Sequence, residues 1–221
     1  MWILGGSLVE TKSGELRWPV SLATFLVITL QLVLPDRLTL NFQNFILVVE
    51  ILLLLFIFIS NPHRIAQHKS HIWYSGIALN FVMTISNIAG VIKLIDLLVN
   101  GKITDPKLLL LSGGSIWISN MVIFSLWYWE IDGGGSGFRS QSEKYQPDFL
   151  FTQLSNPGFA KPDWKPVYLD YFYLSLTNSS AFSPTDVLPL SQIAKSLMAI
   201  QSLISMLTLF LIVARAVNVL H

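Results

Sequence analysis

The sequence predicts an all-α membrane protein with five transmembrane helices and one re-entrant, pore-helix-like loop before the last helix. Of its 221 residues, 52% are hydrophobic and 12% are charged, whereas a soluble domain carries about 25% charged residues. The apolar residues lie in long blocks, and about 20 such residues in a helix cross a bilayer. These features exclude a disordered chain and an ordinary soluble enzyme.

Five apolar blocks carry this prediction. They cover residues 18–34, 41–60, 73–98, 108–131 and 192–220. The first block ends at Pro35, and the second ends before Pro62. We expect the first block to be a retained span, because mixed charges precede it and no small-residue cleavage site follows it.

The charge and the missing motifs argue against several classes of function. The net charge is +1, from 14 basic and 13 acidic residues, so no basic excess exists to bind nucleic acid. The chain has no Cys, which excludes disulfides and Cys-ligated metals. No serine nucleophile elbow, HExxH motif or acid pair is present. We therefore expect no enzyme activity and no cofactor.

The loop over residues 132–165 has a different composition. It contains Gly133, Gly134, Gly135 and Gly137. No Gly-Lys-Ser/Thr follows them, so a phosphate loop is not indicated. We expect the glycines to form a flexible exit from the fourth helix.

The last quarter of the chain carries a family resemblance. Asp186 and Pro189 have an Asp-x-x-Pro spacing, Thr177 lies in a short amphipathic run, and a long apolar helix over residues 195–215 follows. This order resembles the pore module of tetrameric potassium channels. It is also similar to a group of bacterial multi-pass membrane proteins with the same ending.

The resemblance implies two parts, an N-terminal membrane domain of three spans (1–107) and a pore module (108–221). The module would comprise an outer helix, turret loop, pore helix, degenerate filter and inner helix. It implies a homotetramer that conducts monovalent cations in a bacterial inner membrane, with Ser205 as the hinge of the inner helix. The implied pore-lining residues are Thr177, Ala181, Phe182, Ser183, Pro184, Thr185 and Asp186.

The filter segment departs from the family pattern. Residues 181–185 replace Thr-Val-Gly-Tyr-Gly and contain no glycine. Selective filters use successive backbone carbonyls, and glycine reaches backbone angles that other residues do not. Pro184 fixes φ and lacks an N–H. We therefore expect a weakly selective cation channel at most.

Charged residues within the spans support functions other than a cation channel. Glu50 lies near the middle of the second span, where a charge is costly unless it is paired, protonated or hydrated. Lys93 and Asp96 lie three residues apart on one helix face and can neutralise each other. The alternatives are therefore a proton- or ion-coupled carrier centred on Glu50, or a non-conducting scaffold in which Glu50 joins helices.

Small and amide residues indicate helix packing. We expect Asn80, Asn87 and Asn120 to bond between helices, and residues 112–115 (Ser-Gly-Gly-Ser) to allow close helix approach. His63, His68 and His71 fall in a loop without metal-ligand spacing, so no metal site is predicted.

Orientation cues conflict. The positive-inside rule favours a cytoplasmic location for the segment before the last span, whereas the channel resemblance places a turret outside. Because the charge rule weakens for long loops, we expect the turret outside.

Overall fold

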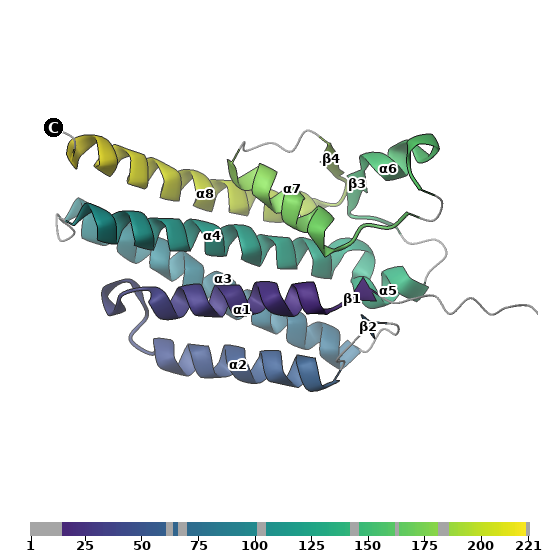
Figure 1. Cartoon of the computed structure of the whole chain (residues 1–221), viewed down its shortest axis with the longest axis horizontal. Coiled ribbons are helices and arrows are strands. Elements are labelled where there is room, and N and C mark those ends of the chain that lie inside the picture. The colour runs from purple at the N-terminus through teal and green to yellow at the C-terminus, as the bar shows by residue number, and fades with distance from the viewer. Residues whose placement is uncertain are drawn as a thin grey trace, which may run out of the picture.

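The computed structural model describes residues 15–60, 64–65, 70–100, 105–141, 146–161, 164–180 and 186–219. Five long helices run side by side along the longest axis of the molecule (Figure 1). They are α1 (Trp18–Val33), α2 (Gln43–Ser60), α3 (Ser70–Val99), α4 (Pro106–Ile131) and α8 (Gln192–Val219). The start of α1 and the end of α8 lie at opposite ends of this axis.

Among the described residues, four helical segments are long and apolar enough to cross a membrane. They are Gln43–Ser60, Ser70–Val99, Lys107–Gly134 and Gln192–Ala214. These segments indicate an integral membrane protein. The predicted first span corresponds to α1, which has 16 residues, about 24 Å at 1.5 Å per residue. It is not among these four segments, so its crossing stays a prediction. It ends at Leu34, which is extended, as the residue before a proline prefers.

The start of α4 follows directly from local sequence. The side chain of Asp105 accepts a hydrogen bond from the Lys107 backbone N–H at 2.9 Å, and Pro106 occupies the first helical position of α4. Both features are favourable at a helix N-terminus. α3 begins earlier than the sequence predicts, at Ser70, and has 30 residues.

Short elements gather at the end of the bundle where α4 finishes. A two-stranded antiparallel sheet joins β1 (Glu15–Leu16) to β2 (Arg64–Ile65). A second joins β3 (Phe149–Phe151) to β4 (Val187–Pro189), with Phe149 opposite Pro189. The helical pieces at this end are α5 (Ser136–Gln141), α6 (Thr152–Ser155) and the 3₁₀ turns η2 (Asp132–Gly134) and η3 (Pro157–Phe159). A further 3₁₀ turn, η1 (Asp36–Leu38), lies elsewhere, directly after α1.

The short amphipathic run before residue 181, which the sequence predicts as a pore-helix-like segment, forms the helix α7 (Tyr168–Ser180). It lies beside α4 and α8 (Figure 1). The following filter-like residues 181–185 lie outside the described residues. The described part of the chain therefore includes a half-length helix but shows no re-entrant pore loop.

The glycine cluster after α4 is a defined turn, which corrects the expected flexible exit. Gly133, Gly134 and Gly135 have φ of 57°, 79° and 94°, values that favour glycine. A Cβ on Gly135 would lie 3.0 Å from the Glu130 carbonyl oxygen and 3.0 Å from the Trp73 ring. The turn therefore needs glycine both for its backbone angles and for close packing.

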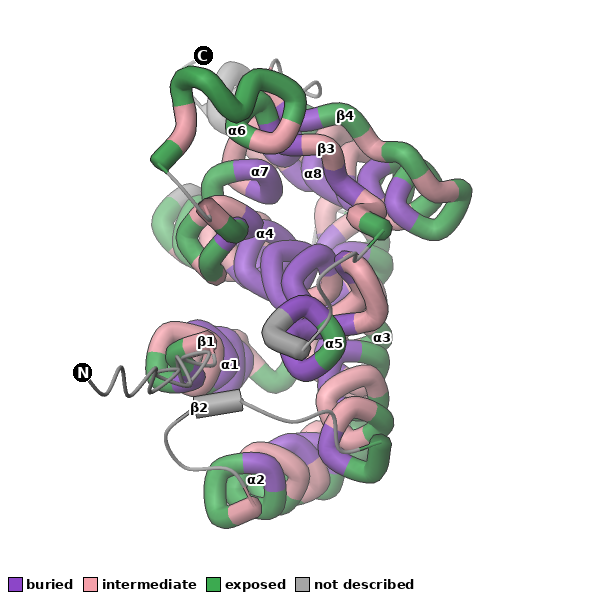
Figure 2. Tube along the Cα trace, turned by 90° about the vertical axis from the view of Figure 1, so that its right-hand side faces the viewer, coloured by how far each residue is buried: buried purple, intermediate pink, exposed green. Residues whose placement is uncertain are grey.

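The core lies around α4, which is buried along most of its length, whereas α2 is largely exposed (Figure 2). One buried cluster joins α4 to α7, α8 and β3 through Tyr128, Phe149 and Leu174. Another joins α4 to α1 and α3 through Val122, Val27 and Met83. Large apolar side chains that stay exposed on α2 and α8, such as Phe45, are suited to contact lipid.

Candidate functional site

Glu50 is fully buried in α2, so it faces other helices, as the cost of exposing a charge to acyl chains predicts. Its Oε1 accepts a hydrogen bond from Gln31 Nε2 at 3.3 Å. Its Oε2 is buried and has no hydrogen-bond partner within the described residues. The carboxyl group therefore has one amide partner and no cation beside it in the described chain.

A chain of amides connects Glu50 to one end of the bundle. Gln43, in the first turn of α2, donates through Nε2 to Gln31 Oε1 at 3.0 Å, and Gln31 in turn donates to Glu50. Gln43 is partly exposed, whereas Gln31 is buried. Because helical side chains lean toward the N-terminus, Glu50 points along α2 toward Gln43. We call these three residues the Glu50 relay.

A second polar site lies toward the opposite end of the same helices. A cavity of about 30 Å³ lies between α1, α2, α3 and α4, and its polar lining includes Arg17, Thr24, Asn80 and Glu130. This volume is enough for about one water molecule. We call this site the Arg17 cavity.

The Arg17 guanidinium is incompletely bonded. Arg17 is 5% exposed, and its Nε and Nη1 have no hydrogen-bond partner within the described residues. Burial lowers the pKa of Arg17, and the charge of Glu130 raises it in part. A Cβ on Gly76 would lie 3.0 Å from Glu130 Oε1, so glycine leaves room for this carboxylate beside α3.

Both sites lie along the interface of α1, α2 and α3. Arg17 directly precedes α1, and Thr24 and Gln31 follow it at intervals of seven residues. All three side chains are buried and lie on the same side of the helix. Leu54 and Ile57 of α2 line the Arg17 cavity and share a helix face with Glu50. Val27 is 0% exposed and lies between Thr24 and Gln31 on α1, and Met83 of α3, also 0% exposed, belongs to the same apolar cluster. An apolar section therefore separates the Glu50 relay from the Arg17 cavity.

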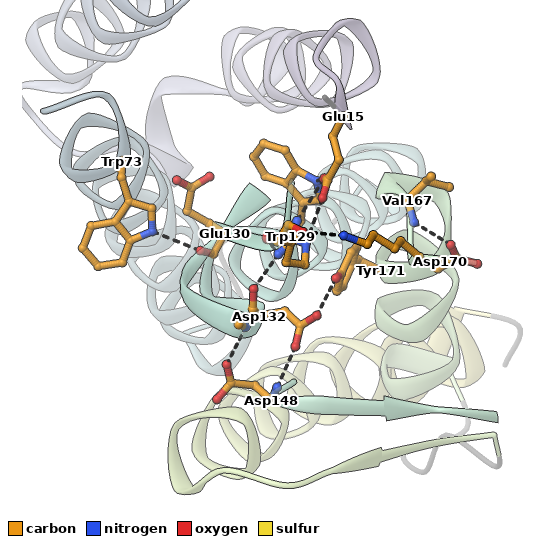
Figure 3. A network of polar contacts seen from close by, with 12 residues as sticks. Glu15, Trp73, Trp129, Glu130, Asp132, Asp148, Val167, Asp170 and Tyr171 are labelled. Carbon is orange, nitrogen blue, oxygen red and sulfur yellow. Dashed lines mark hydrogen bonds and ion pairs between the residues drawn. The ribbon is translucent and has the colours of Figure 1, made fainter. Parts of the chain in front are cut away.

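A polar cluster lies at the end of the bundle where α4 finishes and α5 begins (Figure 3). The buried Arg139 guanidinium binds both oxygens of Glu15, with Nε–Oε1 at 2.9 Å and Nη2–Oε2 at 3.0 Å. Its Nη1 donates to the carbonyl oxygens of Trp129 at 2.9 Å and Asp132 at 2.6 Å. Trp129 Nε1 also donates to Glu15 Oε2 at 2.8 Å. These bonds join the residues before α1 to the end of α4.

Asp132 connects the same cluster to α7 and β3. Its Oδ2 accepts from the Tyr171 hydroxyl at 2.6 Å, and its Oδ1 accepts from the backbone N–H groups of Asp148 and Phe149 at 2.6 and 3.1 Å. Burial raises the pKa of the Tyr171 phenol, so the phenol remains a hydrogen-bond donor. The cluster satisfies its own charges and is structural in character.

Another buried network fixes α7 between α4 and α8. Gln201 Nε2 donates to the hydroxyls of Ser175 and Ser179 at 2.5 and 2.6 Å. Its Oε1 accepts from Asn178 Nδ2 at 2.8 Å and from the Tyr128 hydroxyl. We call these contacts the Gln201 network. They hold the buried face of α7 against α4 and α8 of the same chain.

Among the predicted pore residues, Thr177 has partners within its own helix. The Thr177 hydroxyl donates to carbonyl oxygens of its own helix, those of Tyr173 and Leu174. Ser205 is buried within the unbroken helix α8 and accepts from Asn120 Nδ2 at 2.8 Å; its hinge role stays a prediction. The filter-like residues 181–185 lie outside the described residues, whereas Asp186 has a buried Oδ1 without a partner among them.

The predicted mutual neutralisation of Lys93 and Asp96 is not seen. Lys93 Nζ donates to the Thr39 carbonyl oxygen, and Asp96 Oδ1 accepts from Asn100 Nδ2 at 2.8 Å. The reason is that η1 brings a backbone carbonyl to Lys93, while Asp96 is exposed and finds an amide on its own helix. These two charges are not joined to the Glu50 relay by any bond between described residues.

Other expectations met mixed outcomes. Asn120 joins α4 to α8, as predicted, and Asn80 and Asn87 are buried. His71 is exposed, and His63 and His68 lie outside the described residues. Within the described ranges no three His, Cys, Asp or Glu side chains gather in a way that could hold a metal ion.

Sequence reasoning missed the Arg17 cavity, the Arg139–Glu15 pair and the Gln201 network. Single glutamines inside apolar runs, at Gln31 and Gln201, were a usable signal, because a buried amide must find partners. Arg139 gave no such signal, since it falls in a segment whose composition predicts a loop.

Comparisons with protein-family models, with curated proteins and with solved structures found no match.

Proposed function

We propose that this integral membrane protein carries protons across the membrane and that Glu50 binds and releases the proton. The observation that carries the proposal is the Glu50 carboxyl, fully buried near the middle of an apolar helix with only an amide partner among the described residues. A carboxyl group exchanges a proton, which an amide cannot. Ionisable groups at such depth mark functional sites in membrane proteins.

The arrangement around Glu50 suits a proton path that leads from this carboxyl toward both ends of the bundle. The amides of the Glu50 relay lie toward one end of the bundle, and the Arg17 cavity lies toward the other. In this proposal, water that bonds to the Gln31 and Gln43 amides carries the proton on the first side, because an amide does not exchange a proton itself. The apolar section at Val27 and Met83 closes the interval between them. In this proposal, a change in helix packing opens the apolar section and lets the proton on Glu50 reach the Arg17 cavity.

Proton flux into vesicles tests this function. Purified protein is reconstituted with a pH-sensitive dye, and a potassium diffusion potential drives protons inward. We expect wild-type vesicles to acidify at least tenfold faster than Glu50→Gln vesicles. Asp96→Asn is the matched control, because it removes an exposed carboxyl from α3 and should leave the flux unchanged. Equal rates in wild-type, Glu50→Gln and protein-free vesicles would refute the proposal.

A second candidate is the weakly selective cation pore. It is favoured by the half-length helix α7 beside α4 and α8 and by the buried Oδ1 of Asp186, which has no hydrogen-bond partner among the described residues. One such segment per chain requires several subunits around an axis. Reversal potentials under bi-ionic K⁺/Na⁺ conditions should show little discrimination. A strongly K⁺-selective current would contradict the argument from the missing glycines, and a monomeric protein would contradict the pore.

A further inference from the structure

An apolar groove lies between α1, α4 and α7, away from the Glu50 relay. Its volume is about 500 Å³, within the range of about 300–1,000 Å³ that small-molecule pockets occupy. Its walls include Trp18, Leu22 and Leu26 of α1 and Leu169 and Phe172 of α7. Trp18, Leu22 and Leu169 are 63%, 59% and 69% exposed, so the groove is open to the side of the bundle.

The groove offers almost no free polar group. Glu15 and Tyr168 are its polar lining residues. The Glu15 carboxylate binds Arg139, and the Tyr168 hydroxyl shares a hydrogen bond of 2.7 Å with Ser125. A ligand that needed hydrogen bonds inside the groove would find both groups occupied. The chemistry of the walls therefore favours a hydrocarbon.

The length and level of the groove match one leaflet of a bilayer. Along α1 it runs from Trp18 to Leu26, and Glu15 and Leu16 of β1 extend it beyond the helix start. The helical part is about 12 Å long at 1.5 Å per residue, which fits within half of the roughly 30 Å hydrocarbon core. Trp18 lies at its outer end, and tryptophan is typical of the membrane interface. An acyl chain entering at this level would stay within a single leaflet.

A cation lies close to the outer end. Lys165 is exposed, two residues before the groove residue Val167. Its Nζ donates to the Arg139 carbonyl oxygen at 2.7 Å, and Arg139 holds Glu15 of the groove lining. An ammonium group has three donors, so two remain to bind a phosphate oxygen.

We propose that this groove holds one acyl chain of an anionic phospholipid, with its headgroup phosphate beside Lys165. The proposal does not depend on proton transfer at Glu50. It predicts that a lipid remains with the protein at one lateral position, whereas other apolar faces, such as that of α2, exchange lipid freely.

Photolabelling in vesicles tests the site. The full-length protein is reconstituted with phosphatidylglycerol that carries a diazirine on one acyl chain, and labelled peptides are identified after illumination. We expect label on residues 18–26 and 167–172 above that on α2. Leu22→Trp should reduce the groove label about tenfold by filling the groove, whereas Leu52→Trp, at an exposed leucine of α2, should not.

Two further variants keep the test decisive. Leu169→Trp fills the groove from α7 and replaces Leu22→Trp should that variant fail to fold. Lys165→Gln should lower the label from phosphatidylglycerol several-fold and leave that from phosphatidylcholine unchanged. Label spread evenly over α2 and α1, or unchanged in both filling variants, would overturn the proposal. Cross-linked protein dimers through residues 18–26 would instead identify a second copy as the occupant and also overturn it.

Discussion

Arg139 shows how one side chain can hold distant segments together. Its guanidinium binds Glu15 with two bonds and caps the carbonyl oxygens of Trp129 and Asp132. It also lies over the Tyr171 ring, 5.2 Å from the centroid. An arginine offers five donors in a fixed fork, which a lysine or glutamine cannot reproduce. The end of α4 therefore depends on this residue.

Replacing Arg139 should destabilise the fold strongly. Arg139→Gln leaves the Glu15 carboxylate without its cation and frees two carbonyl oxygens. Breaking a buried pair in this way costs about 3–5 kcal/mol. Thermal unfolding in detergent measures the change, with Arg37→Gln at an exposed arginine as the control. Equal melting temperatures for the two variants would mean that the cluster does not stabilise the fold.

At the scale of elements, α4 and α8 approach closely at one glycine. A Cβ on Gly113 would lie 2.7 Å from Ile212 Cδ1, whereas a Cβ on Gly114 would meet nothing within 4 Å. The predicted small-residue patch is thus confirmed at Gly113, and its neighbour faces open space.

The two glycines give a matched pair of variants. Gly113→Val should destabilise the protein by about 1–3 kcal/mol through overpacking, and Gly114→Val should do so by much less. Adding Ile212→Ala to the first variant should recover part of the loss. Chemical unfolding monitored by tryptophan fluorescence checks this, and equal losses for both glycines would contradict the packing account.

The Gln201 network should control the docking of α7. Gln201→Leu removes the acceptor of the Tyr128 hydroxyl and the donor to the Ser179 hydroxyl, at about 1–3 kcal/mol for each unsatisfied group, while Asn178 keeps its bond to the Met198 carbonyl oxygen. We expect faster amide hydrogen exchange across α7, while Gln153→Leu, at an exposed glutamine of α6, should leave it unchanged. Unchanged exchange in Gln201→Leu would show that apolar contacts alone hold α7.

The long helices could be predicted from the sequence, whereas most of the polar sites between and beyond them could not. The apolar blocks predict α2, α3, α4 and α8, because their length and composition decide whether they can cross a bilayer. The buried position of Glu50 follows from the cost of exposing a charge to lipid. The Arg17 cavity could not be predicted, because it depends on how four helices pack. The ordered end cluster was also missed, since its glycine-rich sequence is typical of a loop.

The whole-molecule arrangement predicts a membrane topology. Arg37, between α1 and α2, and Phe159, between α4 and α8, are separated by α2, α3 and α4, so they should face opposite sides. The chain has no Cys, so Arg37→Cys and Phe159→Cys each give one reactive thiol. A membrane-impermeant maleimide should label only one of them in intact, uniformly oriented vesicles. Labelling of both would contradict the three crossings.

The central claim is that the Glu50 carboxyl exchanges a proton within the membrane, and infrared difference spectroscopy tests it most directly. Spectra of reconstituted wild-type protein and Glu50→Gln are recorded between acidic and alkaline pH in H₂O and D₂O. We predict a carboxyl C=O band that changes with pH, shifts in D₂O and is absent from Glu50→Gln. A wild-type spectrum whose pH-dependent carboxyl bands are the same as those of Glu50→Gln would contradict the account.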